Sequence, residues 1–241
     1  MTSQITGSSF DSLASALAPI EWAIAPFPVA YPQAVAAMEA RVRHIADGEA
    51  AELIWLLEHP ALYTAGTSAK PQDLLNDNAL PVFQSGRGGQ FTYHGPGQRV
   101  AYVMLDVKAR FGGDVRAFTS ALEQWLIGTL ADLGVPAFTI DGRTGVWVEV
   151  KRGPDAGHPA KIAAIGLRIR RGVSFHGVAL NVSPNLAHYG GIVPCGLADS
   201  HVTSLAALGA KARSKNVDIA LKTSFASHFD ARLIDGDAPR V

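Results

Sequence analysis

Short apolar segments of strand length alternate along this chain with segments of helical periodicity, and this order constrains the fold more than any other feature. Helices are expected at 31–48 and 115–133, with a short helix after Thr203 and a last helix after Asn216. Strands are expected at 51–58, 100–105, 145–150, 161–170 and 173–182. The chain shows no internal repeat and no linker that would divide it. Strands interleaved with helices therefore predict one α/β domain.

The two long helical segments place apolar residues at spacings of three and four. The first segment contains Val35, Met38, Val42 and Ile45 in this pattern. The second follows Asp114, a residue type favoured at a helix N-cap, and stops at Gly134. Its apolar face is predicted to consist of Phe118, Leu122, Trp125, Leu126 and Leu130.

Composition narrows the class of protein. Hydrophobic residues make up 48% of the 241 residues, which is enough for a sizeable core. Basic and acidic residues both number 21, so no overall positive field argues for binding to nucleic acid. No segment reaches the roughly 20 apolar residues of a membrane span, and the first forty residues lack the basic start of a secretory signal. We expect a cytoplasmic protein with a flexible extension over residues 1–20 and a single folded domain over 21–241.

Cys195 is the only cysteine, so the chain forms no internal disulfide and no zinc site built on several thiolates. Pro194 and Gly196 flank it, and turn-forming residues of this kind can present a reactive side chain to a ligand. Free cysteine is also among the residue types most often buried in a core. The residues around Cys195 leave both interpretations open, a nucleophile and a packing residue.

Residues 87–98, RGGQFTYHGPGQ, combine five glycines or prolines with polar side chains. Little side-chain bulk near the backbone lets a ligand approach the main chain closely, although a tight turn between strands would explain the glycines equally well. A strand pattern follows this segment, whereas phosphate-binding loops lead into a helix. A nucleotide site is therefore poorly supported.

Two further polar residues stand in segments that otherwise read as strands. Lys161 opens the apolar run KIAAIGL, where it is either a solvated lysine at the strand edge or an ammonium beside an anionic site. His176 lies in SFHGVALNV and either hydrogen-bonds within the sheet or serves as the base for a cysteine nucleophile.

Three motifs together resemble the lipoyl(octanoyl) transferases, which move an octanoyl group from acyl carrier protein to a lysine of lipoate-dependent enzymes. They are RGGQFTYHGPGQ at 87–98, KIAAIGLRIRRGVSFHGVALNV at 161–182 and PCGL at 194–197, and the match extends from about Ala61 to Leu205. The resemblance implies the fold of biotin and lipoate protein ligases, in which helices flank a central mixed sheet. It also implies that Cys195 and Lys161 are the catalytic pair.

Residues that contact the substrate are likewise implied by the resemblance, and His176 is expected to support the site without touching the substrate. The implied substrate-binding residues are Arg87, Gly88, Gly89, Gln90, Phe91, Thr92, Tyr93, His94, Ala164, Ile165, Gly166, Gly177, Val178 and Ala179. No metal and no cofactor are expected.

The resemblance implies a cytoplasmic monomer whose partners are octanoyl-acyl carrier protein and the lipoyl domains of 2-oxoacid dehydrogenases and of the glycine cleavage H protein. Nucleic acid and membranes are not expected partners. Arg168, Arg170 and Arg171 suggest a basic patch for the acidic carrier, or simply a solvated sheet face. The alternative functions are a thioester hydrolase that uses Cys195 and His176, a lipoate ligase that activates its substrate with ATP, and a catalytically silent lipoyl- or acyl-binding module.

Overall fold

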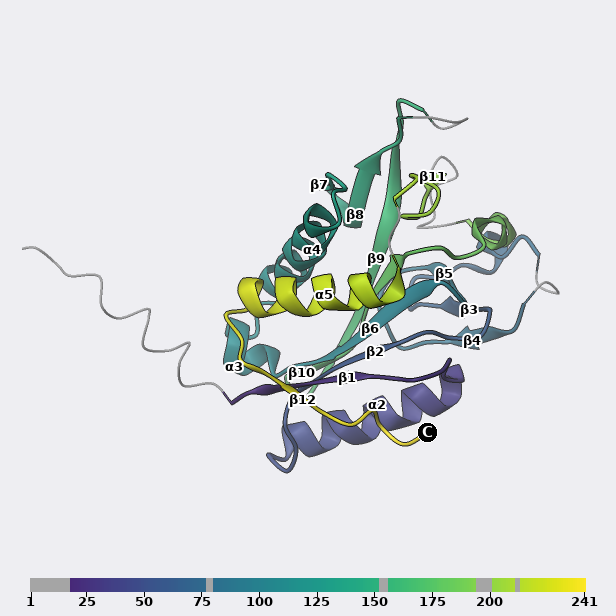
Figure 1. Cartoon of the computed structure of the whole chain (residues 1–241). Coiled ribbons are helices and arrows are strands. Elements are labelled where there is room, and N and C mark those ends of the chain that lie inside the picture. The colour runs from purple at the N-terminus through teal and green to yellow at the C-terminus, as the bar shows by residue number, and fades with distance from the viewer. Residues whose placement is uncertain (1–17, 77–79, 152–155, 194–200, 211–212) are drawn as a thin grey trace, which may run out of the picture.

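A mixed sheet of nine strands runs through the middle of the described chain (Figure 1). The computed structural model describes residues 18–76, 80–151, 156–193, 201–210 and 213–241. The strands follow the order β12-β1-β2-β6-β10-β9-β8-β7, and β11 pairs with β9. Their bounds are β1 Ile20–Ile24, β2 Leu53–Leu57, β6 Gln98–Met104, β7 Phe138–Ile140, β8 Arg143–Glu149, β9 Pro159–Arg170, β10 Val173–Asn181, β11 His201–Val202 and β12 Leu233–Asp235.

A second, smaller sheet lies beside the large one. Its order is β4-β3-β5, with β3 Leu62–Ala65 between β4 Val82–Gln84 and β5 Phe91–His94. Tyr63, Phe91 and Tyr93 form a separate small core there with Ile192. Two 3₁₀ helices, η1 Pro71–Asp73 and η2 Leu186–Gly191, complete this part of the molecule.

Helices cover both faces of the large sheet (Figure 1). On one face, α4 Val115–Asp132 and α5 Ser214–His228 enclose the larger core with the short helix α3 Val107–Phe111. On the other face, α2 Tyr31–Ala46 packs through Ala34, Met38 and Val42 against β2, β6 and β10. The prediction of a mixed α/β fold with a central sheet between helices is confirmed.

The two long helices form where their periodicity predicts them. All five residues predicted for the apolar face of α4 are buried, and the Asp114 side chain accepts hydrogen bonds from the N–H groups of Arg116 and Ala117. In α2, Met38 and Val42 are buried, whereas Val35 and Ile45 are only partly buried at the edge of the core. The apolar pattern therefore identified both helices correctly.

One predicted helix is wrong, and several strands were not predicted. The segment after Thr203 forms consecutive turns, closed by hydrogen bonds such as Gly209 N–H to Ala206 O at 3.0 Å. Gly209 has φ +79°, which ends right-handed helical geometry before a helix is established. The last helix begins at Ser214, whereas it was expected to begin after Asn216. The sequence did not predict β1, β3, β4, β5, β7, β11 or β12.

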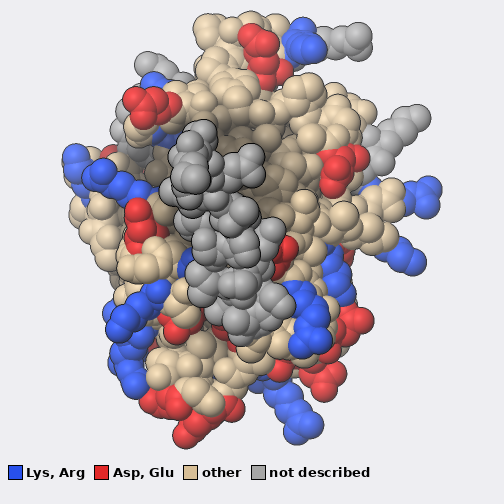
Figure 2. Space-filling view, turned by 90° about the vertical axis from the view of Figure 1, so that its left-hand side faces the viewer, with Lys and Arg blue, Asp and Glu red and all other residues tan. Residues whose placement is uncertain are grey.

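The described chain begins close to the first strand of the large sheet. Residues 1–17 of the expected extension lie outside the described residues, and β1 already begins at Ile20. In the described part of the chain, no helix has the length and apolar character that crossing a membrane requires. Figure 2 shows basic and acidic side chains interspersed on the face at the left of Figure 1, in keeping with a formal net charge of zero.

Candidate functional site

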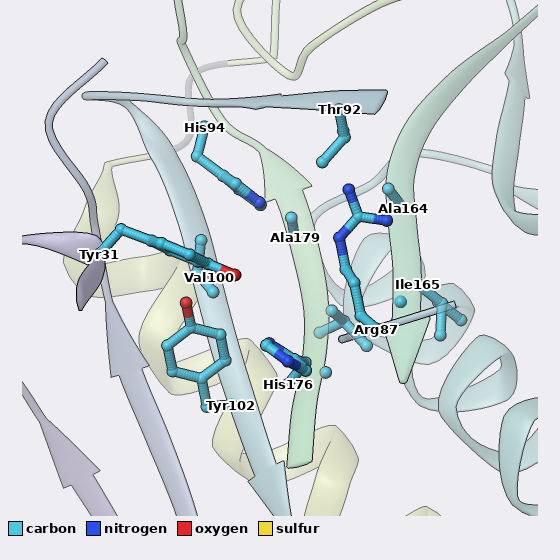
Figure 3. A pocket seen from close by; sticks show the side chains of 13 residues that line it. Tyr31, Arg87, Thr92, His94, Val100, Tyr102, Ala164, Ile165, His176 and Ala179 are labelled. Atoms are coloured by element: carbon cyan, nitrogen blue, oxygen red, sulfur yellow. The ribbon is translucent and has the colours of Figure 1, made fainter. Parts of the chain in front are cut away.

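Two neighbouring cavities lie on the α2 side of the large sheet and share Arg87, Ala164 and Ile165. The first, called here the tyrosine cavity, is also lined by Tyr31 and Tyr102 (Figure 3). The second, called here the lysine cavity, contains Lys161. Because the two share three residues, they form one continuous site with a lysine at one end and tyrosines at the other.

The floor of the tyrosine cavity comes from three adjacent strands. In the antiparallel registers, Gly177 of β10 lies between Gly166 of β9 and Tyr102 of β6. Two residues along, Ala179 lies between Ala164 and Val100. Small side chains on the two central strands keep this stretch of sheet open, because side chains two positions apart share a face.

Gly166 and Gly177 cannot carry a larger side chain without displacing their surroundings. A Cβ on Gly166 would lie 2.7 Å from Cδ of Arg87, and a Cβ on Gly177 would lie 2.1 Å from the carbonyl oxygen of Ala101. The glycine at 166 thus makes room for the Arg87 side chain, while the glycine at 177 allows close approach of β6. Both glycines are required by packing as well as by the shape of the cavity.

Arg87 is buried and held by oxygen atoms of the small sheet. Its Nη2 donates to Thr64 Oγ1 at 2.8 Å, to Thr64 O at 2.9 Å and to Gln90 O at 2.9 Å, and its Nη1 donates to Gly88 O at 2.9 Å. Charge-assisted bonds of this kind fix a guanidinium firmly. The cation therefore stands at the junction of the two cavities.

Lys161 faces the cavities because β9 contains a bulge. Val146 pairs with Ala163 but Trp147 pairs with Lys161, so β9 has one extra residue, Ile162, at this point. Ile162 and Ala163 both pack into the core under α4 and α5. If side chains simply alternated between the two faces along β9, Lys161 would lie on the core side with Ala163. The bulge turns Lys161 to the face that carries Ala164.

The side chain of Lys161 is fixed by β8. Its Nζ donates to the carbonyl oxygen of Thr144 at 2.9 Å and lies 4.8 Å from the centre of the Trp147 ring. Gly145 has φ +119°, and a Cβ there would lie 2.7 Å from Ala163 O and 3.3 Å from Cε of Lys161. The glycine therefore leaves room for the lysine to lie along β8.

Three buried histidines around the tyrosine cavity are neutral near pH 7. Burial lowers the pKa of His59 to about 4, that of His94 to about 3 and that of His176 to about 3. Nearby Arg87 contributes to the lowered pKa of both His94 and His176. Neutral imidazoles with such low pKa values are weak bases at physiological pH.

His94 is held in one orientation by a chain of amides. Its Nδ1 lies 2.7 Å from Gln98 Oε1, while Gln98 Nε2 donates to Tyr93 O at 3.1 Å and to Asn181 Oδ1 at 3.0 Å. These bonds identify the Gln98 oxygen as the acceptor, so His94 donates from Nδ1. Figure 3 shows the His94 ring pointing into the tyrosine cavity.

His176 adopts an unusual backbone conformation for a strand residue, with φ +62°. Its ring stacks on Phe175 at 4.8 Å between centroids and meets Tyr102 edge-on at 6.2 Å. It lines the tyrosine cavity directly, although it was expected to support the site from behind the substrate-contacting residues. A left-handed residue inside a strand is strained, and such strain is common at functional sites.

The structure brings most of the predicted site residues together. Those lining the tyrosine cavity are Arg87, Thr92, His94, Ala164, Ile165, Gly166, Gly177, Val178 and Ala179. Gly89, Gln90 and Phe91 line the lysine cavity with Lys161. Gly88 instead donates its N–H to Leu167 O at 2.8 Å, and the Tyr93 ring packs against Tyr63 and Tyr189 in the small core.

Cys195 lies outside the described residues. The described chain stops at Val193, whose N–H donates to Asp73 O at 2.8 Å, and resumes at His201. There β11 pairs with β9 so that Val202 is opposite Lys161, and Thr203 N–H donates to Lys161 O at 3.0 Å. The chain that follows the segment 194–200 therefore runs directly beside Lys161.

Several lining residues escaped the sequence analysis. They are Tyr31, Val100 and Tyr102 in the tyrosine cavity, and Ser68, Gly142, Arg143, Thr144 and Trp147 in the lysine cavity. Half of them belong to segments predicted as packing elements and the other half to segments without a predicted element, so the sequence offered no specific signal for them. Within the described ranges, no group of three or more His, Cys, Asp or Glu side chains is placed to hold a metal ion.

The comparisons with known proteins agree on one family. Residues 30–226 match the sequence model of the lipoyl protein ligase A/B catalytic domain. The octanoyltransferase of Caulobacter vibrioides is 58% identical over 222 residues, covering 92% of this chain and 97% of the relative. The octanoyltransferase of Parvibaculum lavamentivorans is 60% identical over 211 residues, covering 87% and 92% respectively.

The fold also occurs among solved structures. A structural study of an archaeal lipoylation system, a bipartite lipoate protein ligase and its E2 lipoyl domain from Thermoplasma acidophilum, contains a chain that superposes with a TM-score of 0.67. The alignment covers 91% of this chain and 88% of that one, at 14% sequence identity. At that identity the likeness concerns the fold alone.

Proposed function

The chain belongs to the lipoyl protein ligase A/B catalytic domain family, and within it we propose that it transfers an octanoyl group from octanoyl-acyl carrier protein to a lysine of lipoyl domains. The observation that carries this proposal is the identity of 55–60% to octanoyltransferases over about nine tenths of the chain. The site agrees with it, since a narrow cavity with a floor of small residues adjoins a buried lysine. The enzyme is thus an acyltransferase.

We place the acyl chain in the tyrosine cavity and the reacting carbonyl in the lysine cavity. Gly166, Gly177 and Ala179 leave a slot over the sheet that suits an unbranched chain. The shared residues Arg87, Ala164 and Ile165 mark the passage between the two cavities. This orientation puts the carbonyl near Lys161, where the proposed chemistry takes place.

Cys195 is the proposed nucleophile. A free thiol with a pKa of about 8.5 is only a few per cent ionised near neutral pH, and an adjacent ammonium stabilises the thiolate. The thiolate attacks the carbonyl carbon of the octanoyl thioester and a new C–S bond forms. The phosphopantetheine sulfur of the carrier leaves and takes up the proton of the Lys161 ammonium, which becomes a neutral amine. The pairing of Val202 with Lys161 supports this assignment, because it brings the chain that follows the Cys195 segment beside the lysine.

Lys161 is the proposed acid and base. The neutral amine of the acceptor lysine attacks the octanoyl-enzyme, its proton passes to the neutral form of Lys161, and Cys195 leaves as the thiolate. An N-octanoyl amide forms as the thioester breaks, and no further reactant is consumed. A nucleophile that holds the acyl group between two substrates predicts ping-pong kinetics.

The buried histidines argue against hydrolysis through a Cys–His pair. His176 would have to act as the base, but burial and the charges of Arg87 and Arg168 lower its pKa to about 3. A base of that strength takes up a proton poorly near pH 7. A cytoplasmic setting, which keeps a single cysteine reduced, suits the transferase that we propose.

Intact mass spectrometry after incubation with octanoyl-acyl carrier protein tests the proposal. The wild-type enzyme should gain a single octanoyl group, Cys195→Ala should gain none, and addition of a lipoyl domain should discharge the adduct. Lys161→Met should acylate slowly and discharge poorly, since both proton transfers depend on its amine. Octanoylated lipoyl domain formed by Cys195→Ala at the wild-type rate would overturn the thioester mechanism.

A further inference from the structure

The wall of the tyrosine cavity that lies across from Ala164 and Ile165 is built by two tyrosines (Figure 3). Tyr31 is the first residue of α2 and Tyr102 belongs to β6, so the wall combines a helix with the sheet. The Tyr31 hydroxyl points toward the interior of the cavity (Figure 3), whereas the Tyr102 hydroxyl is directed to His59 behind the wall. The far end of the cavity is therefore closed by aromatic rings that carry polar tips.

Hydrogen bonds and ring packing hold this wall in place. Tyr102 OH donates to Nε2 of His59 at 2.6 Å, and Nδ1 of His59 donates to the carbonyl oxygen of Val29 at 2.6 Å. The Tyr31 ring packs between His59, at 5.5 Å between centroids, and Phe83, at 5.4 Å. Moving a side chain that is packed on both sides costs free energy. The wall therefore acts as a rigid stop.

The distance from the passage between the two cavities to the tyrosine wall matches the length of a medium-chain acyl group. The cavity runs from β9 across β10 to β6, because Ala164 pairs with Ala179 and Ala179 pairs with Val100. Two strand spacings amount to about 10 Å, which is close to the length of an extended octanoyl chain. A longer chain entering from the lysine cavity would meet the tyrosine rings.

The wall is also unfavourable to additional methylene groups. Tyr31 is 4% exposed, and its hydroxyl is buried next to the side chain of Ser85. Packing further hydrocarbon against a buried hydroxyl provides no hydrogen bond and removes any water that could supply one. Both shape and polarity therefore penalise chains that extend to this point.

We propose that Tyr31 and Tyr102 set the acyl-chain length that the enzyme accepts, with an eight-carbon chain reaching the wall and longer saturated chains excluded. This inference rests on the proposed octanoyl transfer, because it takes the tyrosine cavity as the acyl site. Tyr31 determines the limit from the helix side and Tyr102 from the sheet side. His59 is a positioning residue, since it acts only by holding the Tyr102 ring.

The test measures acyl-enzyme formation by intact mass spectrometry, with carrier proteins that bear saturated chains of six, eight, ten and twelve carbons. Tyr31→Ala and Tyr102→Leu each open the wall independently. We expect each to raise the rate with ten carbons relative to eight by about tenfold, because about two methylene groups gain burial. Ala179→Val narrows the middle of the cavity instead and should shift the preference toward six carbons.

Two further variants distinguish a change in chain-length preference from a general loss of folded structure. Tyr31→Phe retains the ring and the packing, and loss of the buried hydroxyl should raise the ten-to-eight ratio by about threefold. Phe225→Leu removes a buried aromatic ring from α5 on the opposite side of the sheet and should leave the length profile as in wild type.

The outcomes distinguish this inference from the proposed function. A wild-type length profile in Tyr31→Ala, Tyr102→Leu and Tyr31→Phe, with circular dichroism showing folded protein, would overturn the role of the wall while octanoyl transfer stood. A wild-type enzyme that takes up no acyl group from any carrier would instead overturn the function on which the inference rests.

Discussion

The ammonium group of Lys161 lies 4.8 Å from the centre of the Trp147 ring, directly across the β8–β9 pairing. A second contact comes from the same strand, since Thr144 O accepts a hydrogen bond from Nζ at 2.9 Å. β8 thus provides both an aromatic face and a carbonyl oxygen to one side chain of β9. The relationship makes β8 the support for the residue that we propose as acid and base.

Replacement of Trp147 should therefore impair catalysis beyond its effect on stability. Cation–π contacts that exclude water contribute about 2 kcal/mol, so we expect Trp147→Leu to lower kcat for octanoyl transfer by at least about tenfold. Trp147→Phe keeps an aromatic face and should retain more activity. The pH dependence of kcat serves as a second readout, because the ring contacts the proposed acid and base.

Trp125→Phe is the matched control for the loss of a buried indole. Trp125 lies on α4, in the core on the other side of the sheet, where its Nε1 donates to Leu221 O at 2.9 Å. A similar drop in kcat and a similar change of pH profile in this control would show that Trp147 acts only through general packing.

Gly145→Ala tests the room that Lys161 needs. The new Cβ would lie 2.7 Å from Ala163 O and 3.3 Å from Cε of the lysine. Displacement of a reacting group by about 1 Å can cost about a hundredfold in rate, and we expect a loss of that order in acyl-enzyme discharge. Gly134→Ala is the control, since Gly134 lies outside both cavities and also has positive φ, +76°, but a Cβ there meets nothing within 4 Å. Equal losses in both variants would trace the effect to backbone strain alone.

Much of the fold was predictable because its long elements bury one regular face. The helix α4 follows its apolar pattern residue by residue. Short strands such as β5, Phe91–His94, were missed since glycines surround them and their pairing partner β3 is distant in the sequence. The turns at 204–210 carry the same apolar residues as a helix would, and only the left-handed Gly209 stops them.

The site was predictable only through its motifs. Simple alternation along β9 would give Lys161 the same orientation as Ala163, toward the core, and no pattern in the sequence reveals the extra residue that reverses it. Tyr31 and Tyr102 come from segments read as packing elements, and only the tertiary fold brings them to one cavity. Local residues thus identify chemistry, whereas the shape of the cavity depends on strands that are far apart in the chain.

Thr64→Val tests how far Arg87 depends on its buried acceptors. The change keeps the side-chain shape but removes the oxygen that accepts from Nη2 at 2.8 Å and from Nε at 3.3 Å. Leaving buried donors of a charged group unsatisfied costs about 1–3 kcal/mol. We expect the free energy of unfolding, measured in urea, to fall by that amount and acyl-enzyme formation to slow several-fold.

Thr129→Val provides the comparison for this change. Thr129 is also fully buried, but its hydroxyl donates to Trp125 O within its own helix. Its loss should cost about 1 kcal/mol or less and leave acylation unchanged. If Thr64→Val matched this control in both measurements, the Thr64 hydroxyl would have no special role in holding the guanidinium.

Stability should decline as the pH falls below about 6.5, because three buried histidines resist protonation. Their pKa values move from 6.5 to about 4 for His59 and to about 3 for His94 and His176. Between these limits the unfolded chain binds protons that the folded protein does not, so the free energy of unfolding decreases with decreasing pH. Each histidine contributes up to about 1.4 kcal/mol per pH unit in this window.

Urea unfolding at pH 7.5, 6.5 and 5.5 measures that slope directly. His176→Asn should reduce it by about one third, and asparagine accepts the positive φ of this position better than most residues. His44 is exposed on α2, so His44→Asn is the comparison for removal of a histidine outside the cavity. The same slope in all three proteins would mean that His176 titrates in the folded state as it does in water, and that its cavity admits a charged imidazole.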